Sequence, residues 1–174
     1  MSVTSVDKDF DNLTVTLVAD FDAPIERVWQ LWADPRQLER WWGPPTYPAT
    51  VEKHDLTIGG EVLYFMTGPE DERSRAWWRI TSVDPPTSLD FTDGFADQDG
   101  TPIAGTTTTV QVRLAQHDGR TRMEVRSIFD SREHMKQLDR MGAIEVFQQT
   151  VGQMDALLAD PATRYPESSI DTER

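Results

Sequence analysis

The sequence predicts an α+β fold in which a curved antiparallel sheet of about seven strands surrounds a long C-terminal helix. Three observations predict this class. A period-two alternation of apolar and polar side chains opens the chain and returns across residues 47–129. A helical stripe interrupts it after the first strand, and a much longer helical stripe closes the chain. Helices that stay apart from consecutive, closely spaced strands are typical of an α+β fold with antiparallel pairing.

The first strand and the first helix are predicted by a change of period near residue 22. Apolar side chains alternate across Leu13–Ala19, which indicates a half-buried strand. Pro24 suits the first turn of the helix that follows. Asp34-Pro35 ends this helix, and Arg36–Trp41 is predicted to form one further short turn, which gives one or two short helices after the first strand. The apolar stripe of the helix consists of Ile25, Val28, Trp29 and Trp32.

Six further strands are predicted between residues 50 and 129, separated by Gly, Pro and acidic turns. Residues 93–105 are predicted to form an acidic, solvated loop, including Asp93, Asp97 and Asp99. The predicted strands are Thr50–Leu56, Glu61–Met66, Ala76–Val83, Ser88–Thr92, Thr106–Ala115 and Arg120–Phe129.

The last helix is predicted from residue 130 or 131 to residue 159, with Asp130 or Ser131 as its N-cap. Its apolar stripe is long enough to cross a whole sheet. A sheet that curls around such a helix touches it along a seam, so the remaining space is a natural ligand pocket. The stripe consists of Leu138, Met141, Ile144, Phe147, Val151, Met154 and Leu158.

The length of 174 residues fits one domain, predicted at residues 12–159. Residues 1–11 are polar and are predicted to be a flexible N-terminus. Residues 160–174 contain two prolines and few apolar side chains, which predicts a disordered C-terminal tail.

Composition excludes several classes of function. The net charge of −13 repels phosphate backbones, so no nucleic-acid partner is expected. The absence of cysteine excludes thiolate nucleophiles, Cys-based metal sites and disulfides. No apolar stretch reaches the ~20 residues of a membrane span, and no signal peptide is visible at the N-terminus, so a cytoplasmic location is expected.

Five motifs in register resemble a known superfamily. They cover most of Leu13–Ala159 and read FDAPIERVWQLWADP (21–35), RWWGPP (40–45), DLTIGGEVLYFM (55–66), ITSVDPPTSLDFT (80–92) and GAIEVFQQTVGQMDALLA (142–159). The sequence resembles the START-like, Bet v 1-like superfamily (SRPBCC), and within it the AHSA-like group related to the C-terminal domain of the activator of the heat-shock protein 90 ATPase.

The resemblance implies a helix-grip fold with a hydrophobic cavity between sheet and long helix, but it does not imply one activity. Members of the superfamily bind lipids and other hydrophobic ligands, act as aromatases or cyclases, or serve as cochaperones. The chaperone activator itself carries an additional N-terminal domain that contributes chaperone contacts. No part of this sequence corresponds to that domain.

Candidate catalytic residues are few. The sequence lacks a G-x-S-x-G elbow and an S-x-x-K motif. The histidines at positions 54, 117 and 134 have no metal-ligand spacing, and His134 is predicted in the exposed first turn of the last helix. His54, which follows the Trp41-Trp42 segment, and Tyr64 are the candidates for proton transfer. Neither a metal nor a cofactor is expected.

Aromatic and methionine side chains are the candidate ligand-binding groups, because six tryptophans and six methionines can line an irregular apolar pocket. Trp77 and Trp78 are adjacent in a strand, so they point to opposite faces. The candidate pocket residues are Trp32, Trp41, Trp42, Tyr64, Met66, Trp78, Phe91, Met123, Phe147, Val151 and Met154.

Three functions follow from these patterns. The first is non-catalytic binding of an apolar or aromatic small molecule. The second is a cyclase- or hydrolase-like enzyme that uses the same cavity. The third is a chaperone-cofactor or stress-response module that docks through exposed tryptophans, a surface that would equally serve a homodimer. A buried polar group with a perturbed pKa would favour the enzyme, and an exposed apolar patch would favour docking.

Overall fold

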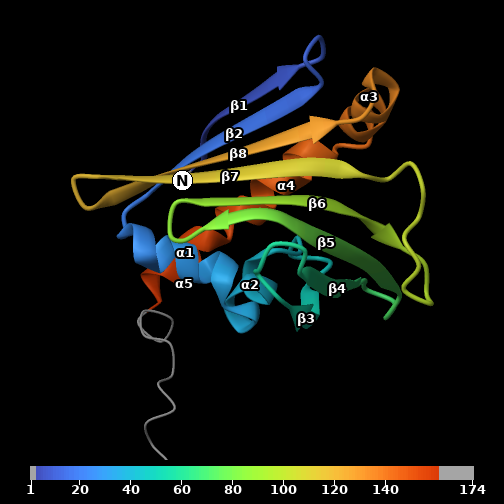
Figure 1. Ribbon diagram of the computed structural model, residues 1–174, viewed down its shortest axis with the longest axis horizontal. Helices are drawn as coiled ribbons and strands as arrows, with labels where there is room; N and C mark the ends of the chain where they lie inside the picture. The colour runs from blue at the N-terminus through green and yellow to red at the C-terminus, as the bar shows by residue number, and fades with distance from the viewer. Residues whose placement is uncertain (1–2, 161–174) are drawn as a thin grey trace, which may run out of the picture.

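The computed structural model describes residues 3–160, whose strands form one curved antiparallel sheet (Figure 1). Its eight strands lie in the order β1-β2-β8-β7-β6-β5-β4-β3. This arrangement confirms the predicted α+β helix-grip fold. The bounds are β1 Val3–Asp9, β2 Thr14–Phe21, β3 Ala49–His54, β4 Glu61–Thr67, β5 Arg73–Asp84, β6 Ser88–Ala96, β7 Thr108–His117 and β8 Arg120–Phe129.

The N-terminal segment differs from the prediction of a flexible end at residues 1–11. Val3–Asp9 forms β1, the edge strand, which pairs with β2. Lys8 anchors it, because its ammonium group lies 2.7 Å from a carboxylate oxygen of Asp139 and 3.0 Å from one of Glu145. Sequence composition missed this strand because main-chain pairing and ion pairs hold it. Apart from Asp160, the predicted tail at residues 160–174 lies outside the described residues.

The predicted last helix is divided into three consecutive helices, of which α4 runs behind the sheet in Figure 1. Ser131 caps the first of them by accepting a hydrogen bond from the backbone N–H of His134 at 3.0 Å. The helix is interrupted at Gly142, whose φ of 76° is left-handed, and again at Gln153. The helices are α1 Ile25–Ala33, α2 Pro35–Trp41, α3 Arg132–Arg140, α4 Ala143–Gly152 and α5 Met154–Ala159.

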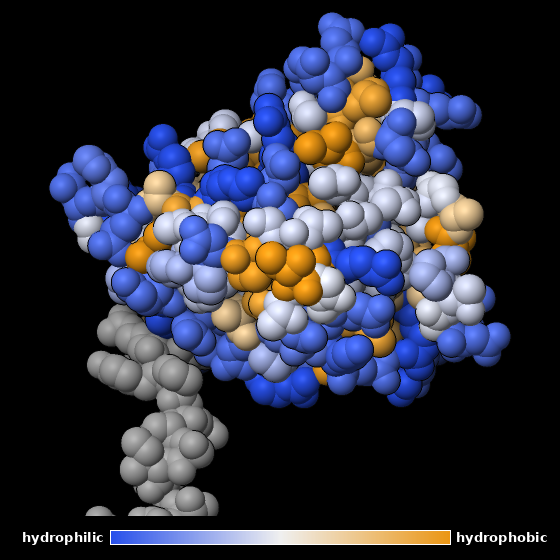
Figure 2. Space-filling model, viewed as in Figure 1, coloured by the Kyte–Doolittle hydropathy of each residue, from blue (hydrophilic) through white to orange (hydrophobic). Residues whose placement is uncertain are grey.

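Alternation along the strands settles which side chains face the helices. On β5, Ala76, Trp78 and Ile80 are buried and face the concave side. Trp77 is on the opposite, convex face, as the pleat requires, and its indole N–H donates to the carbonyl oxygen of Phe95 at 3.2 Å. The view that includes the convex face is mostly hydrophilic, with hydrophobic side chains in small separate groups (Figure 2).

The main core is densest between α1, α2 and the sheet. An aromatic cluster, defined here as Trp32, Trp41, Trp42, Tyr64, Trp78 and Phe91, fills this region through edge-to-face and stacked contacts. A second, smaller cluster of Val15, Phe129, Met135 and Ile144 joins β2 and β8 to α3 and α4. No helix within the described residues is long and apolar enough to cross a membrane.

Candidate ligand-binding cavity

Between the two cores, the sheet and the C-terminal helices enclose a cavity of about 320 Å³. This volume is at the lower end of the ~300–1,000 Å³ range of small-molecule sites. The strands β4 to β8 supply one wall, and α3 and α4 supply the other. Most lining groups are apolar, including Met66, Ala76, Val110, Phe129, Leu138, Ile144 and Phe147.

Trp42 belongs to the aromatic cluster and also lines the cavity. It is 8% exposed, and its ring lies edge-on to Trp78 and Phe147, with centroid distances of 4.8 and 6.1 Å. The side-chain amide of Gln153 fixes the backbone on either side by donating to the carbonyl oxygens of Trp41 and Gly43 at 3.1 and 2.8 Å. Trp42 is therefore held rigidly at the inner end of the cavity.

Asp93 is the carboxyl group in the sheet wall. It lies on the concave face of β6, opposite Trp78 on β5 and Thr108 on β7. Burial raises the pKa of this carboxyl to about 7, and a hydrogen bond from the backbone N–H of Thr108 opposes the rise. Protein atoms surround Asp93 on most sides. Its side chain is still partly exposed, because it faces the cavity. Within residues 3–160 no cation forms an ion pair with Asp93.

Tyr64 places a phenol in the same cavity. The side chain is 5% exposed, and burial, followed by the charge of Asp93, raises its pKa above the ordinary value. The hydroxyl therefore stays protonated at neutral pH. The buried indole N–H groups of Trp42 and Trp78 act on the phenol oxygen in the direction that lowers its pKa, but neither reaches the geometry of a full hydrogen bond.

His134 lines the helical wall, and only 14% of its side chain is exposed. The predicted exposed position is therefore wrong. The first turn of α3 folds back over β8, so that the imidazole packs edge-on to Phe129 with a centroid distance of 5.6 Å. Its Nδ1 atom lies 2.9 Å from a carboxylate oxygen of Asp130, which orients the ring.

The structure divides the eleven predicted pocket residues into two groups. Trp42, Tyr64, Met66 and Phe147 line the cavity. The other seven are at most 1% exposed and do not line it, because they fill the core beside it. These are Trp32, Trp41, Trp78, Phe91, Met123, Val151 and Met154.

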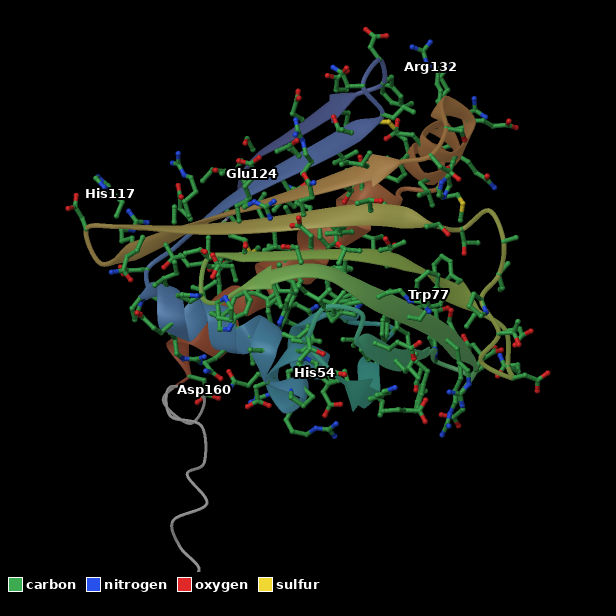
Figure 3. The ribbon with its side chains drawn as sticks, viewed as in Figure 1. His54, Trp77, His117, Glu124, Arg132 and Asp160 are labelled. Atoms are coloured by element: carbon green, nitrogen blue, oxygen red, sulfur yellow. The ribbon has the colours of Figure 1, made fainter. Side chains whose placement is uncertain are left out.

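His54, the other predicted candidate for proton transfer, lies away from the cavity. Its Nε2 atom is 3.1 Å from the carbonyl oxygen of Trp32, which ties β3 to α1. Figure 3 shows His54 beside α2 and β3, and His117 at the tip of the turn between β7 and β8. No group of three or more His, Asp or Glu side chains in residues 3–160 is arranged to hold a metal ion.

The prediction that Asp93 belongs to a solvated loop is wrong, because β6 continues to Ala96. A signal for this was present in the sequence. The alternation of Leu89 and Phe91 continues through Asp93 to Phe95, which places the carboxyl on the face that carries the apolar side chains. Its acidic neighbours concealed the pattern.

Comparisons with known proteins agree with this architecture. Residues 22–159 match the family described as Activator of Hsp90 ATPase homolog 1-like protein. Among curated proteins, none matches the chain. A crystal structure of protein Ms6760 from Mycobacterium smegmatis is 48% identical, with a TM-score of 0.82 over 90% of this chain and 96% of that one.

A solution structure of a protein from Arthrobacter aurescens is 46% identical, with a TM-score of 0.88 over 97% of this chain and 98% of that one. DynU16, described as a putative protein in the dynemicin biosynthetic locus, shares the fold at 19% identity, with a TM-score of 0.66 over 88% of this chain and 50% of that one. Because the family match spans most of the described domain, the chain belongs to the Activator of Hsp90 ATPase homolog 1-like family.

Proposed function

We propose that the protein binds a small, largely apolar or aromatic molecule in the cavity between the sheet and α3–α4. The observation that carries this proposal is the cavity of about 320 Å³, whose walls are mainly aliphatic and aromatic. Such walls favour burial of an apolar ligand at ~25 cal/mol per Å². Asp93 and Tyr64 add hydrogen-bonding groups that would orient one polar group of the ligand.

The rim of the cavity supports entry of a ligand from solvent. Phe95 on β6 is 48% exposed and Val146 on α4 is 41% exposed, and both line the cavity. These two apolar side chains, one on the sheet and one on α4, would contact a ligand as it enters. The ligand would then reach Trp42 at the inner end, whose fluorescence would report its arrival.

The docking alternative has less support. Trp42 and Trp78 are 8% and 0% exposed, and Trp77 is partly buried with its N–H bonded to Phe95. The tryptophans therefore do not offer the exposed apolar patch that a chaperone contact or a homodimer through these residues would need.

Titration with 2-naphthol, a bicyclic aromatic with one hydroxyl, tests the proposed function. We expect saturable quenching of tryptophan fluorescence at one molecule per chain. Ala143→Phe, at a partly exposed wall position, should fill the cavity and weaken binding at least tenfold. Ala115→Phe makes the same change on an exposed strand position outside the cavity and should leave binding unchanged. Equal affinities for the two variants would contradict the proposal.

A further inference from the structure

The sheet wall of the cavity contains a carboxyl group whose position no structural contact requires. Asp93 has no ion-pair partner within residues 3–160, and the backbone N–H of Thr108 is the group there that opposes the rise in its pKa. Burying a carboxylate without a cation costs free energy. Its strand neighbours on the same face, Phe91 and Leu89, are both fully buried apolar side chains. An apolar residue at position 93 would therefore continue this row of buried apolar side chains at a lower free-energy cost of burial.

A protonated hydroxyl faces the same space. Tyr64 lies close enough for the charge of Asp93 to raise its pKa, and no hydrogen-bond acceptor within residues 3–160 receives its O–H. The indole N–H groups of Trp42 and Trp78 act on the phenol oxygen only in the direction that lowers its pKa and form no full hydrogen bond with it, so the phenol O–H is available to a bound molecule. The cavity therefore holds a protonated phenol and a carboxyl that ionises near neutral pH.

A carboxylate base and a neutral hydroxyl donor that line the same apolar pocket are suited to one reaction class. A ketone with an α-hydrogen needs a base at the α-carbon and a donor at the carbonyl oxygen, where negative charge develops. The apolar surroundings strengthen both interactions because little water competes.

We propose that the cavity is an enolisation site, in which Asp93 removes an α-proton from a bound ketone while the Tyr64 hydroxyl donates a hydrogen bond to the carbonyl oxygen. This inference rests on the proposed function, since the ketone is the bound small molecule. The α C–H bond breaks and its proton joins the Asp93 carboxylate. The C–H electron pair forms a C=C bond, and the carbonyl π electrons move to the oxygen, giving an enolate. Return of a proton from the carboxyl to carbon completes the cycle without a co-reactant.

The other ionisable groups that line the cavity are Tyr64 from β4, in the same wall as Asp93, and His134 from α3, in the opposite wall. Tyr64 stays protonated over the neutral range because burial raises its pKa. Asp93 is active as the carboxylate, so the exchange rate should increase with pH through a value of about 7 and then level off. His134→Gln should leave this profile in place if Asp93 is the base, and should remove it if His134 is the base.

The test is exchange of the α-protons of 2-tetralone with solvent in D₂O, followed by proton NMR. We expect acceleration by the wild-type protein, with tetralin, the hydrocarbon that lacks the carbonyl, as a competitive inhibitor. Asp93→Asn should lower the rate at least ~100-fold, and Tyr64→Phe should lower it on the order of 100-fold. Asp99→Asn, an exposed loop carboxyl, and Tyr47→Phe, on the surface, are the matched controls and should retain the wild-type rate.

The outcomes separate this inference from the proposed function. If 2-tetralone and tetralin bind but exchange stays at the buffer rate, or if Asp93→Asn retains the rate, the enolisation site is overturned and ligand binding stands. Binding of tetralin with exclusion of 2-tetralone also overturns it. If neither molecule nor 2-naphthol binds, the proposed function fails as well. Circular dichroism checks that each variant is folded, and the wild-type pH profile and tetralin competition stand without any variant.

Discussion

Asp93 on β6 lies directly opposite Trp78 on β5, and both side chains face the concave side of the sheet. Trp78 is fully buried and stacks on Phe91, with ring centroids 4.0 Å apart and planes inclined by 14°. Asp93 opens instead on the cavity. This cross-strand pair marks the boundary where the packed aromatic cluster ends and the cavity begins, and it places an ionisable group at that boundary.

The first prediction concerns the pH dependence of stability. The pKa of Asp93 is about 7 in the folded chain, above its ordinary value of 3.8. Because the folded value is the higher, the stability that Asp93 contributes is fully present below about pH 4 and is lost as pH rises through about 7. At ~1.4 kcal/mol per pKa unit, the loss is on the order of 4 kcal/mol before it is reduced by the partial exposure of the carboxyl.

Asp93→Asn should remove this part of the pH dependence. The free energy of unfolding, measured with urea at several pH values between 4 and 8, should fall less with increasing pH in the variant than in the wild type. The difference between the two proteins isolates Asp93, because every other ionisable group is shared. Parallel pH curves would mean that the carboxyl is as well solvated in the folded chain as in the unfolded one.

The second prediction compares two phenylalanines on either side of the boundary. Phe91 is 0% exposed within the aromatic cluster, whereas Phe147 on α4 is partly exposed and borders the cavity. Phe91→Ala should lower the free energy of unfolding by ~3–5 kcal/mol, because it opens a new void in a packed core. Phe147→Ala enlarges a space that already exists, so its cost should be less than about half of that. Chemical unfolding of both variants measures this, and equal losses would contradict the assigned boundary.

The sequence predicted those parts of the fold that depend on local pattern. The change from period two to helical spacing near residue 22 located β2 and α1, and the turn signals located β3 to β8. The seven buried candidates that miss the cavity show the limit of such reasoning. Apolar character and face predict burial, but whether a buried side chain meets another side chain or a cavity depends on packing between distant elements.

Two of the ionisable groups of the cavity, Asp93 and His134, were not predicted from the sequence, for different reasons. Asp93 belongs to a run of acidic residues, which ordinarily indicates a solvated loop, although the period-two pattern extends through it. His134 is in the first turn of a helix, and its burial arises from the way α3 folds back over Phe129. The burial of His134 could be found only from a tertiary contact, whereas the position of Asp93 could have been found from the alternation along the strand.

The third prediction concerns the ion pairs that attach β1 to the C-terminal helices. Lys8 contacts Asp139 and Glu145, and hydrogen bonds to these carboxylates raise the pKa of Lys8. About a third of the Lys8 side chain is exposed, so its removal in Lys8→Met should cost less than ~1 kcal/mol at low salt. The loss should shrink in about 1 M NaCl, where screening acts within ~3 Å.

Lys136→Met is the matched control for this prediction. Lys136 is exposed on α3, and no ion pair of Lys136 occurs within the described part of the chain. The variant removes the same charge without removing a contact, so its unfolding free energy should stay close to that of the wild type at both salt concentrations. If Lys8→Met behaves in the same way, the ion pairs do not hold the edge strand.

The fourth prediction uses the break that divides the C-terminal helical segment. Gly142 precedes α4 with a φ of 76°, a left-handed conformation that costs a residue with a side chain ~1–2 kcal/mol. Gly152 is inside the same helix, and a Cβ atom added there would meet nothing within 4 Å. Gly142→Ala should therefore destabilise the protein, whereas Gly152→Ala should stabilise it by roughly 0.5–1 kcal/mol.

Opposite signs for one chemical change at the glycine before α4 and at the last glycine of α4 would establish that the break at Gly142 is a property of the folded chain. Thermal and urea unfolding of the two variants measure the signs. The break matters for the site, because α3 before it supplies His134 and Leu138 to the cavity wall and α4 after it supplies Ile144 and Phe147. If Gly142→Ala is instead as stabilising as Gly152→Ala, the segment forms a continuous helix. The assignment of both α3 and α4 to the helical wall of the cavity would then be wrong.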